Sequence, residues 1–321
     1  MALEFDDRWV WDFWLVRDGD RHHIFYLQAP RSLGDPDARH WNVSIGHAVS
    51  ADLRDWTVLP DALQPGPAGS WDDASTWTGS VVRHEGRWHL LYTGTSHADD
   101  GLVQRIGLAR SEDLVHWTKH GRAVLEADPR WYEVLDRDAQ HERAWPDQAW
   151  RDPWVFVHPG DGQFHALVTA RVPFGPAVER GVVGHARSAD LVSWEVLPPV
   201  TGPMGFGQME VPQLVAAGGR WHLLFCSDLG TQGERLRADG PGTETFCLVA
   251  DSPTGPFRRL GDGVLEADRP GSTYAGKLHQ DSAGELVFLV WHRTREDGGF
   301  HGAISDPRPV DVLEDGTMRL R

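Results

Sequence analysis

The sequence contains little cysteine, no long apolar run and no excess of positive charge. Cys226 and Cys247 are its only cysteines, and both stand in apolar, strand-like contexts, so we expect buried thiols and no disulfide. No stretch approaches the length that spans a membrane. Residues 1–14 carry acids where a signal peptide would carry a basic start and an apolar run. We therefore expect a cytoplasmic protein without a membrane partner.

Basic residues are outnumbered by acidic ones. There are 31 Lys and Arg against 47 Asp and Glu, which gives a formal net charge of −16. This balance argues against nucleic acid and anionic membranes as partners, because both attract Lys and Arg. No long helical period is visible either, so the fold should be built from strands.

What the chain does have is a repeated hairpin pattern. Each copy is an apolar strand, a turn rich in Gly and Asp, and a second apolar strand. The five copies cover residues 12–29, 78–95, 152–171, 211–227 and 276–293. Two further strands, joined by a turn of the Ser-x-Asp-Leu type, follow most copies. Close versions of that second half lie at 45–59, 106–120 and 183–197, and a looser one lies at 248–260.

Four strands per unit, repeated about five times, indicate radial repetition around an axis. We therefore predict an all-β fold, a single five-bladed β-propeller with four antiparallel strands per blade. One catalytic domain would cover residues 1–321, with 294–321 closing the last blade. A β-sandwich with coincidental similarity is the alternative, and it explains less well why the copies match in order and phase.

Three acidic residues stand at nearly the same phase of the repeat. They are Asp12, Asp152 and Glu210, and each comes shortly before an apolar run. An acid at the start of a strand is more often a turn former or a cap. However, the shared phase and the apolar flanks, where an unpaired carboxylate is costly, favour a functional site.

The phase can be counted back from matching positions in the second strand of each hairpin. By this count Asp12, Thr78 and Val211 are equivalent, Glu210 lies one position earlier, and the fifth copy reaches Gly276. The innermost strands of a propeller surround its axis, so these positions should meet at one mouth of the channel. Two or three converging carboxyl groups are what cleavage of a glycosidic bond requires.

Four short segments resemble those of glycoside hydrolase families 32 and 68, which are five-bladed propeller enzymes that act on β-fructofuranosides. RDP at 151–153 resembles the RDP triplet of both families, and WDFW at 11–14 is similar to the nucleophile segment of the levansucrase branch. EVP at 210–212 and WTGS at 77–80 resemble the acid/base and pocket segments of the invertase branch. The chain lacks the Asn-Asp-Pro-Asn segment of one branch and the Glu-Arg pair of the other, so it matches neither branch fully.

The resemblance implies a retaining mechanism. Asp12 would be the nucleophile, Glu210 the acid/base and Asp152 an ionised group beside Arg151 that stabilises the transition state, with the first two carboxyl groups about 5–5.5 Å apart. The neighbours of Glu210 in the sequence are apolar, so we expect apolar surroundings for its carboxyl group. Residues expected to contact the substrate are Trp11, Trp14, Gln28, Asn42, Trp77, Thr78, Ser80 and Arg151.

The expected substrate is a small carbohydrate, either sucrose or a short fructo-oligosaccharide. The long insertion 128–150 would narrow the pocket, and water or a sugar could act as the acceptor. An inverting arabinofuranosidase or xylosidase of the family 43 type, with carboxyl groups about 6.5–9.5 Å apart, stays open, and so does a sugar-binding propeller without catalysis. The 17 histidines are dispersed without zinc-type spacing, so we expect neither a cofactor nor a catalytic metal, and the oligomeric state stays open.

Overall fold

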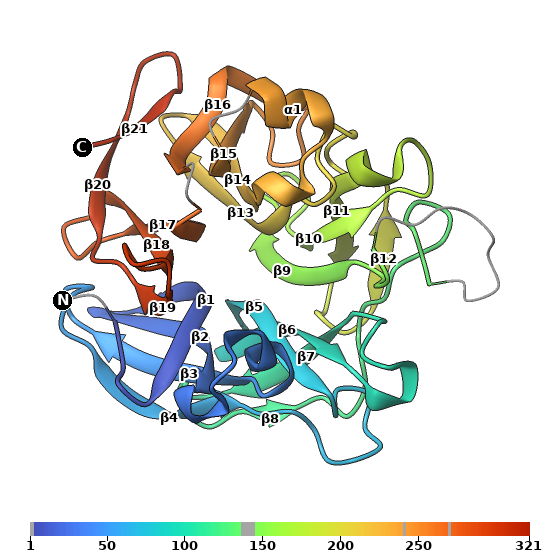
Figure 1. Cartoon of the computed structure of the whole chain (residues 1–321), viewed down its shortest axis with the longest axis vertical. Coiled ribbons are helices and arrows are strands. Elements are labelled where there is room, and N and C mark those ends of the chain that lie inside the picture. Colours follow the sequence, from blue (N-terminus) through green and yellow to red (C-terminus); the bar gives the residue numbers. More distant parts are fainter. Residues whose placement is uncertain (1–2, 136–144, 240–241, 269–270) are drawn as a thin grey trace.

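The computed structural model describes all residues except 1–2, 136–144, 240–241 and 269–270. Five antiparallel sheets stand around a central axis like the blades of a propeller, in chain order around the ring (Figure 1). The five-bladed all-β fold predicted from the repeats is confirmed. In the described part of the chain, no helix is long and apolar enough to cross a membrane.

The first three blades follow the four-strand pattern. Blade one contains β1 (Arg8–Asp18), β2 (Arg21–Pro30), β3 (Ser44–Ser50) and β4 (Thr57–Leu63). Blade two contains β5 (Ser75–His84), β6 (Arg87–Thr95), β7 (Arg105–Ser111) and β8 (Thr118–Lys119). Blade three contains β9 (Trp150–Val157), β10 (Phe164–Arg171), β11 (Gly181–Ser188) and β12 (Trp194–Leu197). In each blade, strands adjacent in sequence pair with each other.

Blades four and five complete the ring. Blade four contains β13 (Glu210–Ala217), β14 (Arg220–Ser227), β15 (Thr243–Ala250) and β16 (Arg258–Asp268). Blade five contains β17 (Thr273–Gln280), β18 (Leu286–Thr294), β19 (Phe300–Ile304), β20 (Arg308–Val312) and β21 (Met318–Leu320). Both β19 and β20 pair with β18, so residues 294–321 do close the last blade, as predicted. Backbone hydrogen bonds between Leu3 and Ile304, 2.9 and 3.0 Å long, attach the first described residue to that blade.

The helical elements are short and lie in the connections between strands. The one α-helix in the described part of the chain is α1 (Glu234–Asp239). The 3-10 turns are η1 (Arg31–Leu33), η2 (Pro36–Trp41), η3 (His97–Asp99), η4 (Ala177–Glu179) and η5 (Leu229–Thr231). Cys226 on β14 is buried and Cys247 on the neighbouring β15 is half-buried, and both are free thiols.

The Ser-x-Asp-Leu turns predicted from the repeat form the same structure in three blades. In blade three, Ser188 donates its hydroxyl hydrogen to Asp190, which accepts the backbone N–H groups of Val192 and Ser193 at 2.9 and 2.7 Å. Leu191 within this turn has φ 64° and is fully buried. Equivalent leucines with φ 63° and 66° are Leu53 and Leu114. The polar cap therefore holds a leucine in an unfavourable backbone conformation, while burial of its side chain stabilises the turn.

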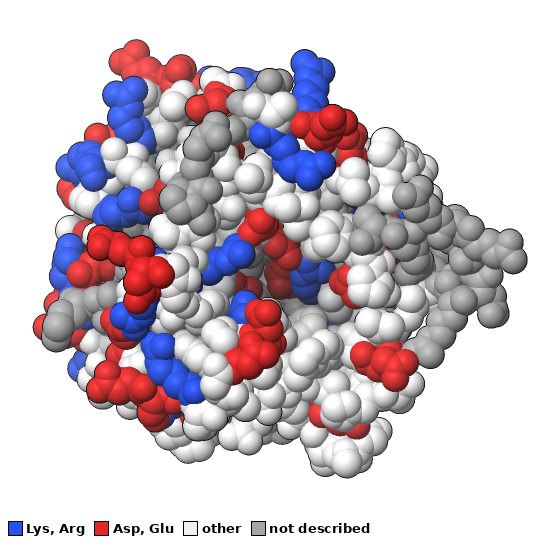
Figure 2. Space-filling view, in the orientation of Figure 1, with Lys and Arg blue, Asp and Glu red and all other residues white. Residues whose placement is uncertain are grey.

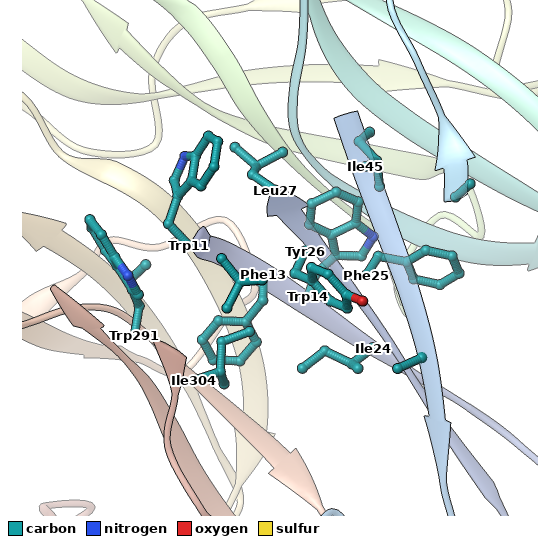
Figure 3. Packing of buried hydrophobic residues seen from close by; sticks show 14 of the residues in the cluster. Trp11, Phe13, Trp14, Ile24, Phe25, Tyr26, Leu27, Ile45, Trp291 and Ile304 are labelled. Carbon is teal, nitrogen blue, oxygen red and sulfur yellow. The ribbon is translucent and has the colours of Figure 1, made fainter. Parts of the chain in front are cut away.

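The apolar core fills the space between neighbouring blades. Strands β2, β6 and β10 are buried along almost their whole length, because both faces of each sheet pack on another blade. Figure 3 shows the cluster around blade one, where Trp14 stacks on Phe25 with ring centroids 6.0 Å apart. Trp291 and Ile304 of blade five belong to the same cluster, so the core also joins the first blade to the last.

All five innermost strands contain a β-bulge at the same level. The pairing register shifts between Trp11 and Phe13 in β1 and between Trp77 and Gly79 in β5. The corresponding shifts lie at residues 151–154 in β9, 210–213 in β13 and 274–277 in β17. A bulge interrupts the strict alternation of side chains and redirects one residue. The ring thus presents five redirected positions around its axis.

Candidate active site

A cavity of about 500 Å³ opens at the propeller axis, at the level of the bulges. Figure 2 shows a hollow at the centre of this face, with acidic and basic side chains gathered in and around it. The cavity is lined by all three predicted acids and by four of the eight residues expected to contact the substrate. These seven are Asp12, Asp152, Glu210, Trp11, Trp77, Thr78 and Arg151.

The bulges explain why the counted phase brings these residues together. Asp12 and Thr78 are the extra residues in the bulges of β1 and β5. Asp152 and Val211 lie in those of β9 and β13, with φ 58° and 51°, and Ala275 in β17 has φ 53°. Non-glycine residues with positive φ persist only where the surrounding structure holds them, and such positions cluster at functional sites.

Two residues expected in the cavity lie elsewhere because of their place in blade one. Trp14 is 1% exposed and packs in the core on Phe25. Gln28 donates from its amide to Ser44 at 3.0 Å and to Asp61 at 2.8 Å, at the far end of β2 from the first hairpin turn. Neither residue lines the cavity. Both predictions of substrate contact are corrected by these positions.

Asn42 and Ser80 also have structural partners instead of a place in the cavity. Asn42 is exposed after η2, and its amide donates to the backbone carbonyl of Ala38 at 2.9 Å. Ser80 is buried in β5 and accepts the N–H of Val155 at 3.0 Å, which ties blade two to blade three. The expected substrate contacts of these two residues are therefore corrected as well.

The Glu210 carboxyl group has polar neighbours, which corrects the expectation of apolar surroundings. The Arg151 guanidinium and the Tyr274 hydroxyl each donate to one of its two oxygens at short range. Arg151 comes from blade three and Tyr274 from blade five. Arg151 also donates to the side chain of Gln208. The Glu210 carboxyl group is thus held in one orientation by groups from both neighbouring blades.

Asp152 is buried among hydrogen-bond donors. Its Oδ2 accepts from the Thr169 hydroxyl at 2.7 Å and from the Val211 N–H at 3.2 Å, and lies 3.5 Å from Nε of Arg151. Burial raises the pKa of Asp152, while the charge of Arg151 acts in the opposite direction. The net direction is upward.

Asp12 has a smaller set of partners. Its Oδ2 accepts a hydrogen bond from the Thr78 hydroxyl at 2.9 Å. Burial, followed by the nearby charge of Asp152, raises the pKa of Asp12 to about 7. The Thr78 hydrogen bond and the charge of Lys277 lower it. Two acids in one cavity therefore differ in environment, since Glu210 is paired with a guanidinium and Asp12 with a hydroxyl.

Several cavity residues were not predicted from the sequence. Those that line the cavity with charged, polar or aromatic groups are Asp37, Arg39, His40, Gln104, Asp228, Tyr274, Trp291, Arg293 and Phe300. Tyr274 could have been found, because it lies at the bulge of β17, two residues before the position reached by phase counting. The others come from connections, such as η2 and the turn at η5, or from β18 and β19 of blade five. No repeat phase marks them.

The insertion 128–150 does not line the cavity in its described residues. Residues 136–144 lie outside the described part of the chain, so the expected narrowing by that segment stays a prediction. The described part of the insertion instead supports Arg151. Asp147 lies 3.6 Å from the Arg151 guanidinium and also contacts Arg171.

One group of side chains has the composition of a metal site. His158, Asp161 and His165 gather at the β9–β10 turn, with their ligand atoms within 4.8 Å of one another. These atoms already have protein partners. Asp161 contacts His165 at 3.1 Å and accepts the Gln163 N–H, and His158 Nδ1 accepts the Gly160 N–H. The group is explained as a hydrogen-bonded turn.

Comparisons with known proteins give a family match and several proteins of related fold. A family model described as "Glycosyl hydrolases family 32 N-terminal domain" matches residues 14–320. The "Extracellular sucrase" of Zymomonas mobilis is 25% identical over 370 residues, which cover 98% of this chain and 81% of that protein. Two solved structures share the fold. The inulosucrase from Halalkalicoccus jeotgali bound to kestose has a TM-score of 0.80 and 24% identity, over 99% of this chain and 87% of that one. A Bombyx mori family 32 β-fructofuranosidase has a TM-score of 0.73 and 22% identity, over 100% and 64%.

Proposed function

The chain belongs to glycosyl hydrolase family 32, and from this membership and the geometry of the cavity we propose that it cleaves β-fructofuranosides with retention of configuration. The chain is therefore a glycoside hydrolase. The observation that carries the proposal is that Asp12, Asp152 and Glu210 meet in one cavity, each at or beside the bulge of a different innermost strand. A sugar-binding propeller has no need of this arrangement.

In the proposed first step, Asp12 attacks the anomeric carbon of the fructosyl unit. The bond between that carbon and the bridging oxygen breaks, and Glu210 gives its proton to that oxygen as it leaves. In the second step, Glu210 takes a proton from water or from a sugar hydroxyl. The resulting oxygen nucleophile attacks the anomeric carbon and releases Asp12. Asp152 and Arg151 bind hydroxyl groups of the fructosyl unit throughout.

The proposed substrates are sucrose and short fructo-oligosaccharides. A cavity of about 500 Å³ has the size of a small-molecule site, and the aromatic residues Trp11, Trp77 and Trp291 are among those that line it. The names of the relatives point the same way, since one is a sucrase and one neighbouring structure contains kestose. The kestose complex is of an inulosucrase, which supports fructosyl transfer as a second outcome of the same mechanism. Cytoplasmic location stays a prediction, while the Zymomonas relative is named extracellular.

The test is a chromatographic analysis of the sugars released from sucrose, kestose, levan, inulin, and arabinofuranosyl and xylosyl oligosaccharides. Free fructose or new fructosyl products, absent with Asp12→Asn, are expected. Release of pentose instead would move the protein to the inverting alternative. Binding of fructosides without turnover would support the sugar-binding alternative.

Retention is tested separately by NMR of the first-formed product. A retaining enzyme transfers the β-fructosyl unit to methanol as the β-fructoside, through two inversions at the anomeric carbon. If the α-anomer forms first, the assignment of Asp12 as a nucleophile is wrong.

A further inference from the structure

Lys277 is a buried cation on the innermost strand of blade five, at the level of the bulges. It lies on β17 directly after the bulge, and only 2% of its surface is exposed. Among the described residues it is not one of those that line the cavity, so a substrate in the cavity does not touch it. The chain has one other lysine, Lys119, since arginine supplies the rest of its basic residues. The neighbours of Lys277 should therefore explain why a lysine, and not an apolar residue, is buried at this position.

Burial of an ammonium group costs several kcal/mol unless nearby groups compensate. Lys277 Nζ donates to the backbone carbonyl of Val211 on β13 at 2.5 Å. The groups that act on its charge are the Cys226 thiol on β14 and the carboxyl groups of Asp12 on β1 and Asp152 on β9. Burial lowers the pKa of Lys277 to about 8, and these neighbours act in the opposite direction. Lys277 thus sits at the centre of the ring, among four other strands.

Three arginines line the cavity as well, and they have other partners. The Arg293 guanidinium pairs with Asp228, and Arg39 donates to the Pro36 carbonyl and to Asp37, although its charge also acts on Asp12. The Arg151 guanidinium donates to Glu210 and lies 3.5 Å from Asp152 and 3.6 Å from Asp147, so its charge is shared among three carboxyl groups. Among the described residues, the Asp12 carboxyl group accepts its hydrogen bond from the uncharged Thr78 hydroxyl. Without the charge of Lys277, burial and two neighbouring carboxyl groups would favour the protonated form of Asp12 more strongly. A protonated carboxyl group is a poor nucleophile.

We propose that Lys277 is a positioning residue whose charge favours the ionised form of Asp12, which is the form able to attack, without contacting the substrate. This inference rests on the proposed function, in which Asp12 is the nucleophile. The charge of Lys277 also favours the ionised form of Asp152. It is placed where the ring brings β1, β9, β13 and β17 together, so one side chain serves acids from two blades.

The first test is the pH profile of kcat/KM for Lys277→Met, with Lys119→Met as the matched control. The methionine side chain is similar in length to that of lysine and carries no charge. The acid limb of the profile should move to higher pH by about 1 unit, with roughly tenfold lower activity below the limb. Lys119 pairs with Asp72 at 2.6 Å near the outer edge of blade two, and its substitution should leave the limb in place. An unmoved limb in folded Lys277→Met overturns the inference.

The second test needs no substrate. Urea unfolding is measured for Asp12→Asn, Lys277→Met and the double variant. If the two side chains are coupled by charge, Lys277→Met should lower the unfolding midpoint less in the Asp12→Asn background, by about half or more. Equal losses in both backgrounds, or an unfolded protein in both, would mean that Lys277 serves packing alone. If Lys277→Met is unfolded but the double variant folds, this result would support the inference.

The two tests separate the inference from the proposed function. No turnover of any fructoside, combined with coupling in urea, would reject the proposed function while the charge pairing of Lys277 with Asp12 stands. Turnover with an unmoved acid limb and additive stabilities would keep the function and reject the role of Lys277.

Discussion

Two residues from different blades hold the Glu210 carboxyl group. Arg151 of blade three donates to one oxygen and Tyr274 of blade five to the other. Because Glu210 itself belongs to blade four, its orientation depends on three neighbouring blades at once. In the proposed mechanism this carboxyl group must face the leaving oxygen. A side chain that rotates freely would adopt this orientation only part of the time.

Removal of the Tyr274 hydroxyl should reduce turnover without unfolding the protein. We expect Tyr274→Phe to lower kcat/KM by about 10- to 100-fold. This factor corresponds to the free energy usually lost when a charged group loses one hydrogen-bond partner. The phenyl ring keeps its contact with Trp291, whose centroid is 6.4 Å away, so the packing should survive. Steady-state kinetics and the urea midpoint of the same sample measure the two effects.

Tyr26 provides the control for that substitution. Its hydroxyl is buried and has no hydrogen-bond partner in the described part of the chain. Tyr26→Phe should therefore leave kcat/KM unchanged. Equal losses for the two tyrosine variants would show that Tyr274 acts through packing and not through Glu210.

At the level of elements, the β-bulge explains both the successes and the errors in the predicted site. In a regular strand, Asp12 and Trp14 would point to the same face. The bulge between Trp11 and Phe13 breaks this alternation, so Asp12 faces the cavity while Trp14 packs between the blades. The other four innermost strands contain a bulge at the same level. The apolar pattern of a strand does not show where a bulge lies. For that reason the pattern alone predicts Trp14 in the cavity, whereas it packs in the core.

The Ser-x-Asp-Leu turns should contribute to stability and not to activity. Asp190→Ala removes the acceptor of the Val192 and Ser193 N–H groups and should lower the free energy of unfolding by about 1 kcal/mol. The turn joins β11 to β12, away from the cavity, so kcat/KM should not change. Urea unfolding and steady-state kinetics on one preparation measure both values.

Asp55 offers a matched aspartate for comparison. It lies in the corresponding turn of blade one, where only its backbone N–H is used, as a donor to Asp52. Asp55→Ala should leave the free energy of unfolding unchanged. The explanation of the turn fails if this variant loses as much stability as Asp190→Ala.

At the scale of the whole molecule, buried histidine pairs make stability depend on pH. His23 contacts His47 at 2.9 Å in blade one, and His165 contacts His185 at 2.9 Å in blade three. Burial lowers the pKa of His47 and of His185 to about 3. The unfolded chain, with a histidine pKa of about 6.5, therefore takes up protons first as the pH falls. Stability should be complete above about pH 6.5 and decline steadily below it.

Urea unfolding at pH 7.5 and 5.5 measures this decline. His47→Gln removes one titrating group and should reduce the difference between the two pH values by about 1 kcal/mol. His97 has an exposed side chain, and His97→Gln should leave the difference unchanged. An equal difference in all three proteins would exclude the buried pairs as its source.

The sequence predicts the ring better than it predicts the wall of the cavity. Five repeats with one phase were enough to predict the propeller and to bring Asp12, Asp152 and Glu210 to one mouth. Arg39 and Asp228 reach the cavity from η2 and from the start of η5. The paths of such connections depend on tertiary contacts, which leave no period in the sequence. The prediction for Asn42 is wrong for a different reason. Its amide donates to a backbone carbonyl of its own segment, that of Ala38, and does not face the cavity.

In the proposed mechanism Asp12 forms a covalent bond to the fructosyl unit. The most direct measurement is mass spectrometry of the enzyme, acid-quenched during turnover of sucrose or kestose and then digested. An added mass of one fructosyl unit is expected on the peptide that contains Asp12, and no such mass with Asp12→Asn. An adduct on Asp152, or turnover to the inverted product with no adduct at all, would contradict the mechanism.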